Sequence, residues 1–70
     1  LSEYGLKIFA YLKAHMDENR QISFTYRELT KQIGYLNPTI GKYLWDLKDR
    51  GFISWAPNRH KGPTTYTVLK

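Results

Sequence analysis

The 70-residue sequence predicts an α+β fold in which three helices accompany a small antiparallel sheet. Two helix signatures lie on either side of Gly34, and two alternating segments flank a loop near the carboxyl end. A further amphipathic segment precedes them. The expected order is therefore helix, strand, helix, helix, strand, strand. A chain of this length forms one small domain, residues 1–70, that buries about 60% of its unfolded surface.

The first helix is expected to begin after Ser2, whose hydroxyl suits an N-cap, and to run to about Asp17. Tyr4, Tyr11 and His15 form a stripe that is either the margin of the core or a contact surface for a partner. A polar linker, residues 17–20, then leads to a short strand at residues 22–24. The apolar residues of the helix share one arc, as expected of a core-facing helix: Leu1, Ile8, Phe9, Leu12 and Met16.

The second helix has a strong local signature at its start. Thr25 and Glu28 have the spacing of a capping box, in which each side chain accepts a hydrogen bond from the other residue's backbone amide. Phe24 and Leu29 have the spacing of a hydrophobic staple. Gly34 is expected to end this helix within three turns.

The third helix is predicted at residues 38–50, with Asn37 as its N-cap and Pro38 at its first position. Ile40, Leu44 and Leu47 are spaced i, i+4, i+7 and are therefore expected to face the core. The opposite face carries a mixed polar and aromatic set: Pro38, Thr39, Lys42, Trp45, Asp46 and Asp49.

The carboxyl-terminal third predicts a β-hairpin. Gly51 ends the third helix and releases the chain into a strand at residues 52–56, and residues 64–68 are alternating and partly β-branched. The loop between them, residues 57–63, is longer than a tight turn requires and carries Arg59, His60 and Lys61.

The net charge of +5 is unevenly distributed. Residues 1–35 hold five Lys and Arg against four Asp and Glu, whereas residues 36–70 hold six against two. The positive excess therefore lies on the third helix and the hairpin. A basic surface of this kind is what a phosphate-facing protein needs, although it also serves solubility.

Several classes of function are excluded by composition. The chain has no cysteine, so it has neither a disulfide framework nor a thiolate metal site. His15 and His60 lie on different predicted elements with no paired carboxylates, and there is no glycine-rich phosphate loop. We therefore expect no enzyme activity, metal or cofactor. No apolar run could span a membrane and no signal peptide is evident, which predicts a cytoplasmic (nucleoid-associated) or nuclear protein. Leu1 in place of Met suggests a fragment of a longer chain.

Two stretches resemble the winged helix-turn-helix domains of prokaryotic repressors. Residues 25–34, Thr-Tyr-Arg-Glu-Leu-Thr-Lys-Gln-Ile-Gly, resemble the first half of that motif, and residues 38–47 resemble its recognition helix. Residues 50–53, Arg-Gly-Phe-Ile, resemble the segment that leads into the wing. The resemblance spans nearly all of the chain and extends to repressors of the SOS-response and multidrug-resistance types. Thr30 stands where the family often has alanine. The chain lacks the extra dimerisation helices of many such repressors, although a homodimer is compatible with the resemblance.

The resemblance implies a set of residues that contact double-stranded DNA. In this architecture the amino-terminal half of the recognition helix enters the major groove, and the preceding helix crosses the backbone. The wing reaches flanking phosphates or the minor groove. The residues implied are Asn37, Pro38, Thr39, Gly41, Lys42 and Trp45 from the recognition helix, Arg27 and Lys31 from the preceding helix, and Arg59, His60 and Lys61 from the wing.

Four of these residues also have a purely structural interpretation. Lys42 has the spacing for an ion pair with Asp46, and Thr39 suits a solvated first turn. Gly41 allows close approach either of DNA or of a neighbouring helix, because an interior helical glycine costs about 1 kcal/mol relative to alanine. Trp45 either stacks on a sugar or base or covers the side of the second helix. The two aspartates of the third helix would repel phosphates, so only its first two turns are expected to dock.

The leading hypothesis is therefore that the chain is the duplex-DNA-binding module of a transcriptional regulator, replication initiator or DNA-targeting enzyme. The alternative is a winged helix used for protein–protein contact, since one fold serves both purposes. A minor alternative is left-handed duplex binding. Lys42 and Trp45 approximate two contact positions of Zα-type domains, but Gly41 stands where that family needs asparagine. The protein-contact alternative draws on aromatic residues predicted to be exposed: Tyr4, Tyr11, Tyr35 and Trp45.

Overall fold

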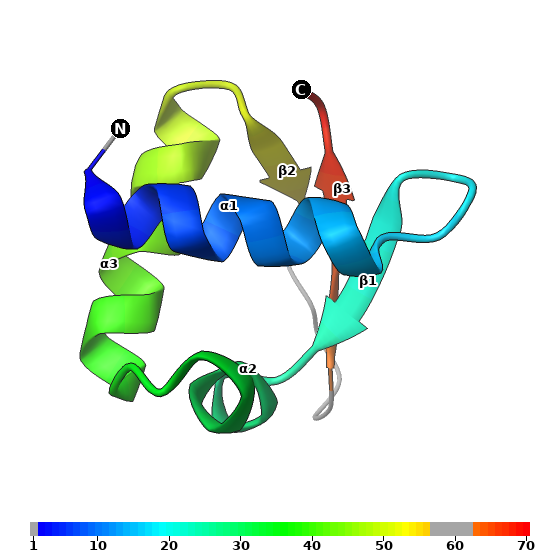
Figure 1. Ribbon diagram of the computed structural model, residues 1–70. Helices are drawn as coiled ribbons and strands as arrows, with labels where there is room; N and C mark the ends of the chain where they lie inside the picture. Colours follow the sequence, from blue (N-terminus) through cyan, green and yellow to red (C-terminus); the bar gives the residue numbers. More distant parts are fainter. Residues whose placement is uncertain (1, 57–62) are drawn as a thin grey trace.

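The structure is a computed structural model that describes residues 2–56 and 63–70 (Figure 1). Three helices and a three-stranded antiparallel sheet follow one another in the predicted order. Some predicted bounds differ by one or two residues: the first helix ends two residues earlier, the first strand begins one residue earlier, and the strand before the loop is one residue shorter at each end. The elements are α1 (Glu3–His15), β1 (Gln21–Phe24), α2 (Tyr26–Ile33), α3 (Asn37–Asp49), β2 (Ile53–Trp55) and β3 (Thr64–Val68).

The last strand of the sequence lies in the middle of the sheet, whose order is β1-β3-β2. Both pairings are antiparallel, and Tyr66 of β3 is the partner of Ile22 on one side and of Trp55 on the other. The predicted pairing of the two strands that flank the loop is therefore confirmed. Within the described ranges, no helix has the length and apolar character needed to cross a membrane.

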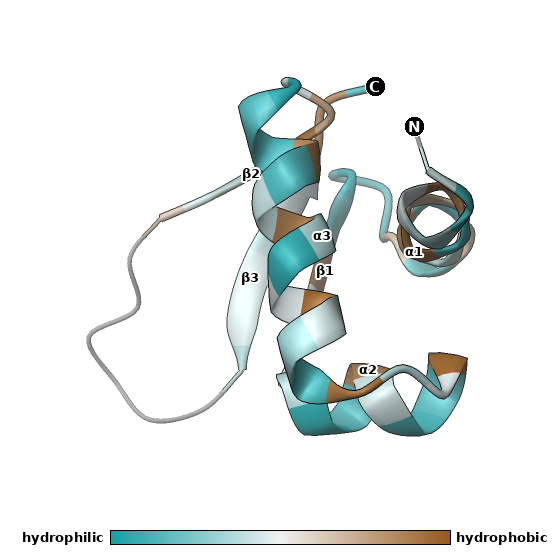
Figure 2. Cartoon of the chain, turned by 90° about the vertical axis from the view of Figure 1, so that its left-hand side faces the viewer, coloured by the Kyte–Doolittle hydropathy of each residue, from teal (hydrophilic) through white to brown (hydrophobic). Residues whose placement is uncertain are grey.

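One hydrophobic core joins all six elements. α3 packs against α1, α2 and β2, and Figure 2 shows it with α1 on one side and the hairpin strands on the other. Phe9 and Met16, which were expected in the core, lie at its edge and are partly buried. Among the residues that the structure describes, ten side chains form the buried core: Ile8, Leu12, Phe24, Leu29, Ile40, Leu44, Leu47, Ile53, Tyr66 and Val68.

The local signals at the first two helices are confirmed. The Ser2 hydroxyl accepts a hydrogen bond of 3.1 Å from the Gly5 amide at the start of α1. Thr25 and Glu28 form both hydrogen bonds of the capping box, each 3.1 Å long. Gly34 caps α2 with φ +90°, a left-handed conformation in which a Cβ would be strained.

The predicted start of α3 is wrong by one residue. Leu36 is the N-cap and makes no side-chain capping bond, so Asn37 is the first helical residue and Pro38 the second. The Asn37 side chain instead accepts a hydrogen bond of 2.8 Å from the Thr30 hydroxyl on α2. Pro38 is tolerated at the second position because that amide has no partner within the helix.

The polar linker between α1 and β1 is an ordered turn. The Asp17 carboxylate accepts hydrogen bonds from the Asn19 and Gln21 amides at 2.8 and 2.9 Å. Arg20 adopts φ 63°, which few residues other than glycine do. Its backbone carbonyl and side-chain Nε bond the Val68 amide and carbonyl at 2.8 and 2.9 Å. The turn therefore fastens the end of β3 to the start of β1.

Candidate nucleic-acid interface

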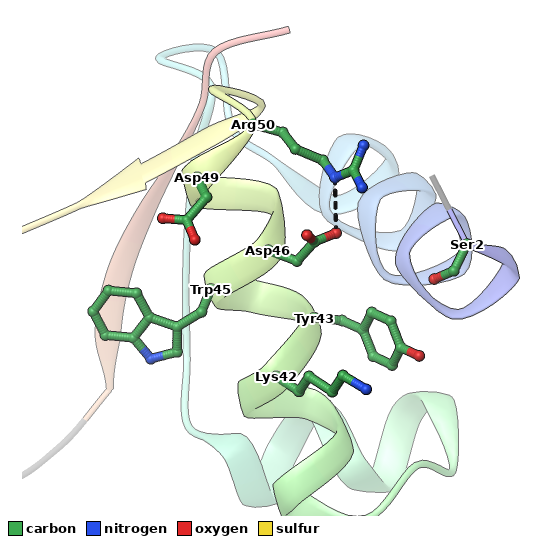
Figure 3. A pocket seen from close by; sticks show the side chains of 7 residues that line it. All are labelled: Ser2, Lys42, Tyr43, Trp45, Asp46, Asp49 and Arg50. Carbon is green, nitrogen blue, oxygen red and sulfur yellow. Dashed lines mark hydrogen bonds and ion pairs between the residues drawn. The ribbon is translucent and has the colours of Figure 1, made fainter.

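The outer face of α3 is exposed, as its sequence period predicts. Ile40, Leu44 and Leu47 are fully buried on the inner face, whereas Lys42 and Trp45 are exposed on the outer one. Asn37 and Pro38 are also exposed, and Thr39 is partly buried. An open depression of about 410 Å³ lies against this outer face (Figure 3). Its lining residues come from α3, its cap and the start of α1: Ser2, Lys42, Tyr43, Trp45, Asp46, Asp49 and Arg50.

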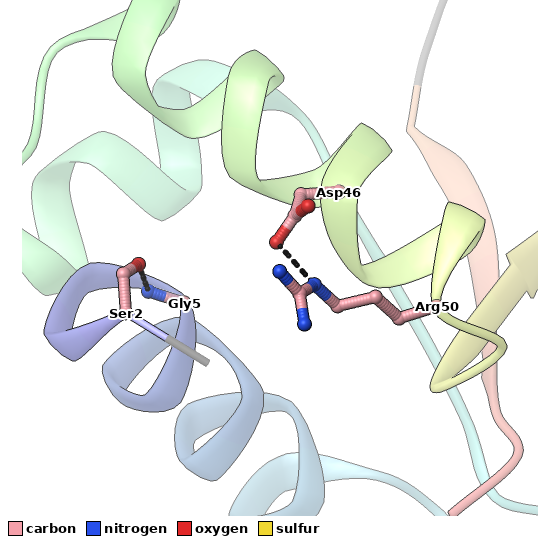
Figure 4. Close-up of polar contacts among 4 residues, drawn as sticks. All are labelled: Ser2, Gly5, Asp46 and Arg50. Carbon is pink, nitrogen blue, oxygen red and sulfur yellow. Dashed lines mark hydrogen bonds and ion pairs between the residues drawn. The ribbon is translucent and has the colours of Figure 1, made fainter.

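The structural alternative for Lys42, an ion pair with Asp46, is not formed. Asp46 pairs instead with Arg50, whose Nε donates to the carboxylate at 3.0 Å (Figure 4). The Lys42 ammonium lies 5.5 Å from the centroid of the Tyr43 ring. The acid of an i,i+4 pair is better placed on the amino-terminal side of the base, and a cation is favoured near a helix carboxyl end, so Arg50 is the better partner. Asp46 therefore does not neutralise Lys42.

Trp45 packs against β2, a contact that neither sequence-based alternative for this residue included. Its ring contacts Trp55 of β2 edge-on, with centroids 5.0 Å apart, and the side chain remains 53% exposed. Lys48, which the sequence reasoning missed, places its ammonium 5.0 Å from the Trp45 ring and 4.5 Å from the Trp55 ring. The i,i+3 spacing of Trp45 and Lys48 is a signal that could have found this contact.

Trp55 connects the exposed Trp45 to the core. Its ring meets Tyr66 edge-on at 5.1 Å, and Tyr66 stacks on Phe24 at 4.4 Å with an interplanar angle of 9°. Tyr66 is only 2% exposed. Burial raises the pKa of its hydroxyl from 10.0 to about 12, and the nearby Tyr26 acts in the same direction. A hydrogen bond with the Thr64 side chain opposes this rise in pKa.

Gly41 lies where α3 approaches the Tyr26 side chain of α2 closely. A Cβ at this position would lie 3.2 Å from the Tyr26 ring of α2, which is tighter than an ordinary contact. Glycine therefore lets α2 and α3 approach closely, which is the structural alternative for this residue. Tyr26 was not singled out by the sequence reasoning, because its contact with α3 depends on how the two helices cross.

The two cations of α2 are exposed, as predicted, but they do not join the depression on α3. Lys31 lines a second hollow of about 190 Å³, formed with Tyr11 of α1 and with β1. The two hollows share no lining residue, and Arg27 lines neither. Arg59, His60 and Lys61 lie outside the described residues, between Trp55 and Thr64 of the hairpin strands.

Of the four aromatic residues predicted to be exposed, Tyr4 and Trp45 are exposed, whereas Tyr11 and Tyr35 are partly buried against the core. Tyr4 of α1 stacks on Tyr43 of α3 at 5.5 Å and meets Tyr35 edge-on at 5.1 Å. Tyr11 lies beside His15, with ring centroids 4.3 Å apart. These contacts do not involve the Trp45 ring, which lies against Trp55. They therefore do not form one continuous aromatic surface.

The features above define a small α+β domain whose third helix offers a solvent-facing side with cations and an exposed tryptophan. No protein-family model matches the chain, and no curated protein matches it. Among the described residues, no group of three or more His, Cys, Asp or Glu side chains is placed to hold a metal ion.

Proposed function

We propose that this domain is a winged helix-turn-helix module that binds double-stranded DNA. α3 is the recognition helix, and the loop between β2 and β3 is the wing. The proposal rests on the outer face of α3. This helix follows α2 after a short turn, and it exposes Lys42 on its amino-terminal half. A helix held in this way is the element that such motifs insert into the major groove.

The distribution of charge along α3 determines which end of the helix approaches the DNA. Lys42 is not neutralised by Asp46, which pairs with Arg50, and Asp49 is exposed one turn further on. Phosphates are attracted to the amino-terminal half and repelled by the carboxyl-terminal end. The helix therefore enters the groove with its first two turns, presenting Asn37, Thr39 and Lys42. Arg27 on α2 contributes a positioning contact to the backbone.

The salt dependence of binding tests the wing. Each neutralised phosphate contributes about 0.9 to the fall of log K with log salt. Replacing Arg59 and Lys61 with alanine is expected to weaken binding to any duplex and to lower this slope by nearly two, as measured by fluorescence anisotropy over a salt series. The matched control is Lys7→Ala with Lys13→Ala, which removes the same charge from α1 and is expected to leave the slope unchanged.

Equal slopes for the parent and the wing variant would remove the wing from the mechanism. If both double variants lost the same amount of duplex affinity, binding would depend on the total charge of the protein and not on the wing. Circular dichroism of the bound duplex distinguishes right-handed from left-handed DNA, and the length of the protected footprint reports one half-site or two.

A second candidate function, docking of a protein, is favoured by the surface around Tyr4. This tyrosine is 47% exposed, and Leu36 in the α2–α3 turn is 73% exposed, which leaves apolar area in water near Tyr35 and Tyr43. Leu36→Ser is expected to abolish any association that uses this surface, as measured by sedimentation, while leaving duplex affinity unchanged. A loss of duplex affinity in this variant would count against a separate protein-docking surface.

A further inference from the structure

We propose that Trp45 and Trp55 form a stacking site for an unpaired base of single-stranded nucleic acid. The inference rests on the proposed function, because it takes nucleic acid as the partner, but it uses a different part of α3. Trp45 lies in the middle of the helix, beyond the residues assigned to the groove. Just over half of its side chain is in contact with water.

The Trp45 ring is held in place by other aromatic rings. It meets Trp55 edge-on at 69°, Trp55 meets Tyr66 at 62°, and Tyr66 stacks on Phe24 in the core. Trp55 and Tyr66 are also cross-strand partners, so the sheet fixes their spacing. A ring that is already ordered loses little conformational entropy when a ligand stacks on it, which favours binding.

The lysines and the exposed indole around this pair of tryptophans together favour nucleic acid over an acidic peptide. The Lys48 ammonium lies within 5.0 Å of both indole centroids, and Lys42 lines the same depression as Trp45. Asp46 is neutralised by Arg50, and Asp49 leaves the carboxyl end of the depression negative. The phosphates are therefore expected on the Lys42 side of Trp45. An acidic peptide would satisfy the lysines but would offer no ring to the exposed indole, whereas a nucleotide supplies both.

Only an unpaired base can use such a site. A base inside a duplex is covered on both faces by its neighbours and must be extruded before it can stack on a side chain. Trp45 stands at the border of the open depression of about 410 Å³, which Trp55 and Lys48 do not line, so its exposed ring is reached from solvent. The site therefore suits a single strand, a strand end or a base displaced from a duplex.

The test uses two ligands with the same number of phosphates: an oligothymidylate and an abasic oligomer of equal length. The parent protein is expected to bind the oligothymidylate at least about fivefold more tightly, since stacking on one aromatic side chain is worth about 5- to 150-fold in affinity. Tryptophan emission is expected to be quenched by the oligothymidylate and not by the abasic strand. Equal affinity for the two strands would overturn the inference, because phosphates alone would then explain binding.

Trp45→Leu is expected to bind the oligothymidylate no better than the abasic strand. The matched control is Tyr4→Leu, which removes a similarly exposed aromatic ring from α1 and is expected to retain the preference for bases. Melting curves confirm that both variants are folded. A preference that survives Trp45→Leu, or quenching by polyglutamate equal to that by the oligothymidylate, would overturn the stacking site.

A blunt duplex measured in parallel separates the two proposals. Binding of the duplex without a preference for bases in single strands would overturn the stacking site and leave the proposed function intact. Failure to bind either form of nucleic acid would overturn both.

Discussion

The thirteen residues of α3 form two faces that differ in burial and therefore in the side chains that they can accept. The inner face carries Ile40, Leu44 and Leu47, which are fully buried among side chains from the other elements. The outer face carries Lys42 and Trp45, which are more than a third exposed. Packing restricts the inner face to apolar side chains of suitable volume, whereas it places no such restriction on the outer face.

The difference teaches where stability and binding are to be sought. Residues of the inner face contribute through burial, so their loss costs free energy of unfolding whatever the ligand. Charged residues of the outer face, such as Lys42, contribute little to stability, because their charges remain hydrated and screened. Substitutions on the two faces should therefore separate into two classes of effect.

The sharpest test of this contrast is Leu44→Ala against Lys42→Ala. The core truncation is expected to lower the free energy of unfolding by about 2–5 kcal/mol, since it removes buried methyl groups and leaves a cavity. Lys42→Ala is expected to change it by no more than about 0.5 kcal/mol. Urea denaturation measures both, and similar losses in the two variants would mean that the helix is rotated from the orientation described.

A second test measures whether water reaches the buried core, and it uses the hydroxyl of Tyr66 on β3 as the probe. Its pKa is raised to about 12 in the folded state, against 10.0 for the ordinary tyrosine hydroxyl, so the folded state holds this proton more tightly. The contribution of this group to stability is present below pH 10 and is lost as the pH rises through 12. One pKa unit corresponds to about 1.4 kcal/mol, so a loss of about 2–3 kcal/mol is expected over this range.

Tyr66→Phe serves as the control, because it removes the titrating hydroxyl and keeps the ring. The difference in unfolding free energy between parent and variant is expected to shift with pH between about pH 9 and pH 12. A difference independent of pH would show that water reaches the hydroxyl in the folded state.

The smallest expected effect is a change in duplex affinity caused by a substitution on the outer face of α3. Asp49→Asn removes a negative charge from the end of α3 that is proposed to repel phosphates. Duplex affinity is expected to rise about two- to fivefold at low salt, the size of an exposed charge interaction, and the gain should fade as salt increases. Glu18→Gln, an equal charge change in the turn after α1, is the control and is expected to have less effect.

The parts of the fold that local sequence could predict are those stabilised by neighbours in the chain. α2 is an example, since its capping box joins residues three apart and Gly34 supplies its left-handed cap. The buried face of α3 follows from the helical period alone. The strand at Thr64–Val68 was placed at its observed bounds from its alternation and β-branched residues.

The parts that sequence could not predict depend on contacts between distant residues. Asn37 has the residue type of an N-cap, but the Thr30 hydroxyl of α2 engages its side chain and the helix begins after Leu36. The partner of Trp45 depends on where β2 lies beside α3. The pairing of Asp46 with Arg50, by contrast, could have been predicted from the sequence. The preferred orientation of i,i+4 pairs favours Arg50 over Lys42 as the partner.

The central position of β3 has a consequence for the way the protein is made. Both outer strands pair with β3, although β1 is synthesised about forty residues earlier in the chain. Until β3 has left the ribosome, β1 and β2 lack the strand with which both of them pair, although the helices between them can already form. The sheet therefore closes only after β3 is available, through a pairing of β1 with β3 that joins segments about forty residues apart in the sequence.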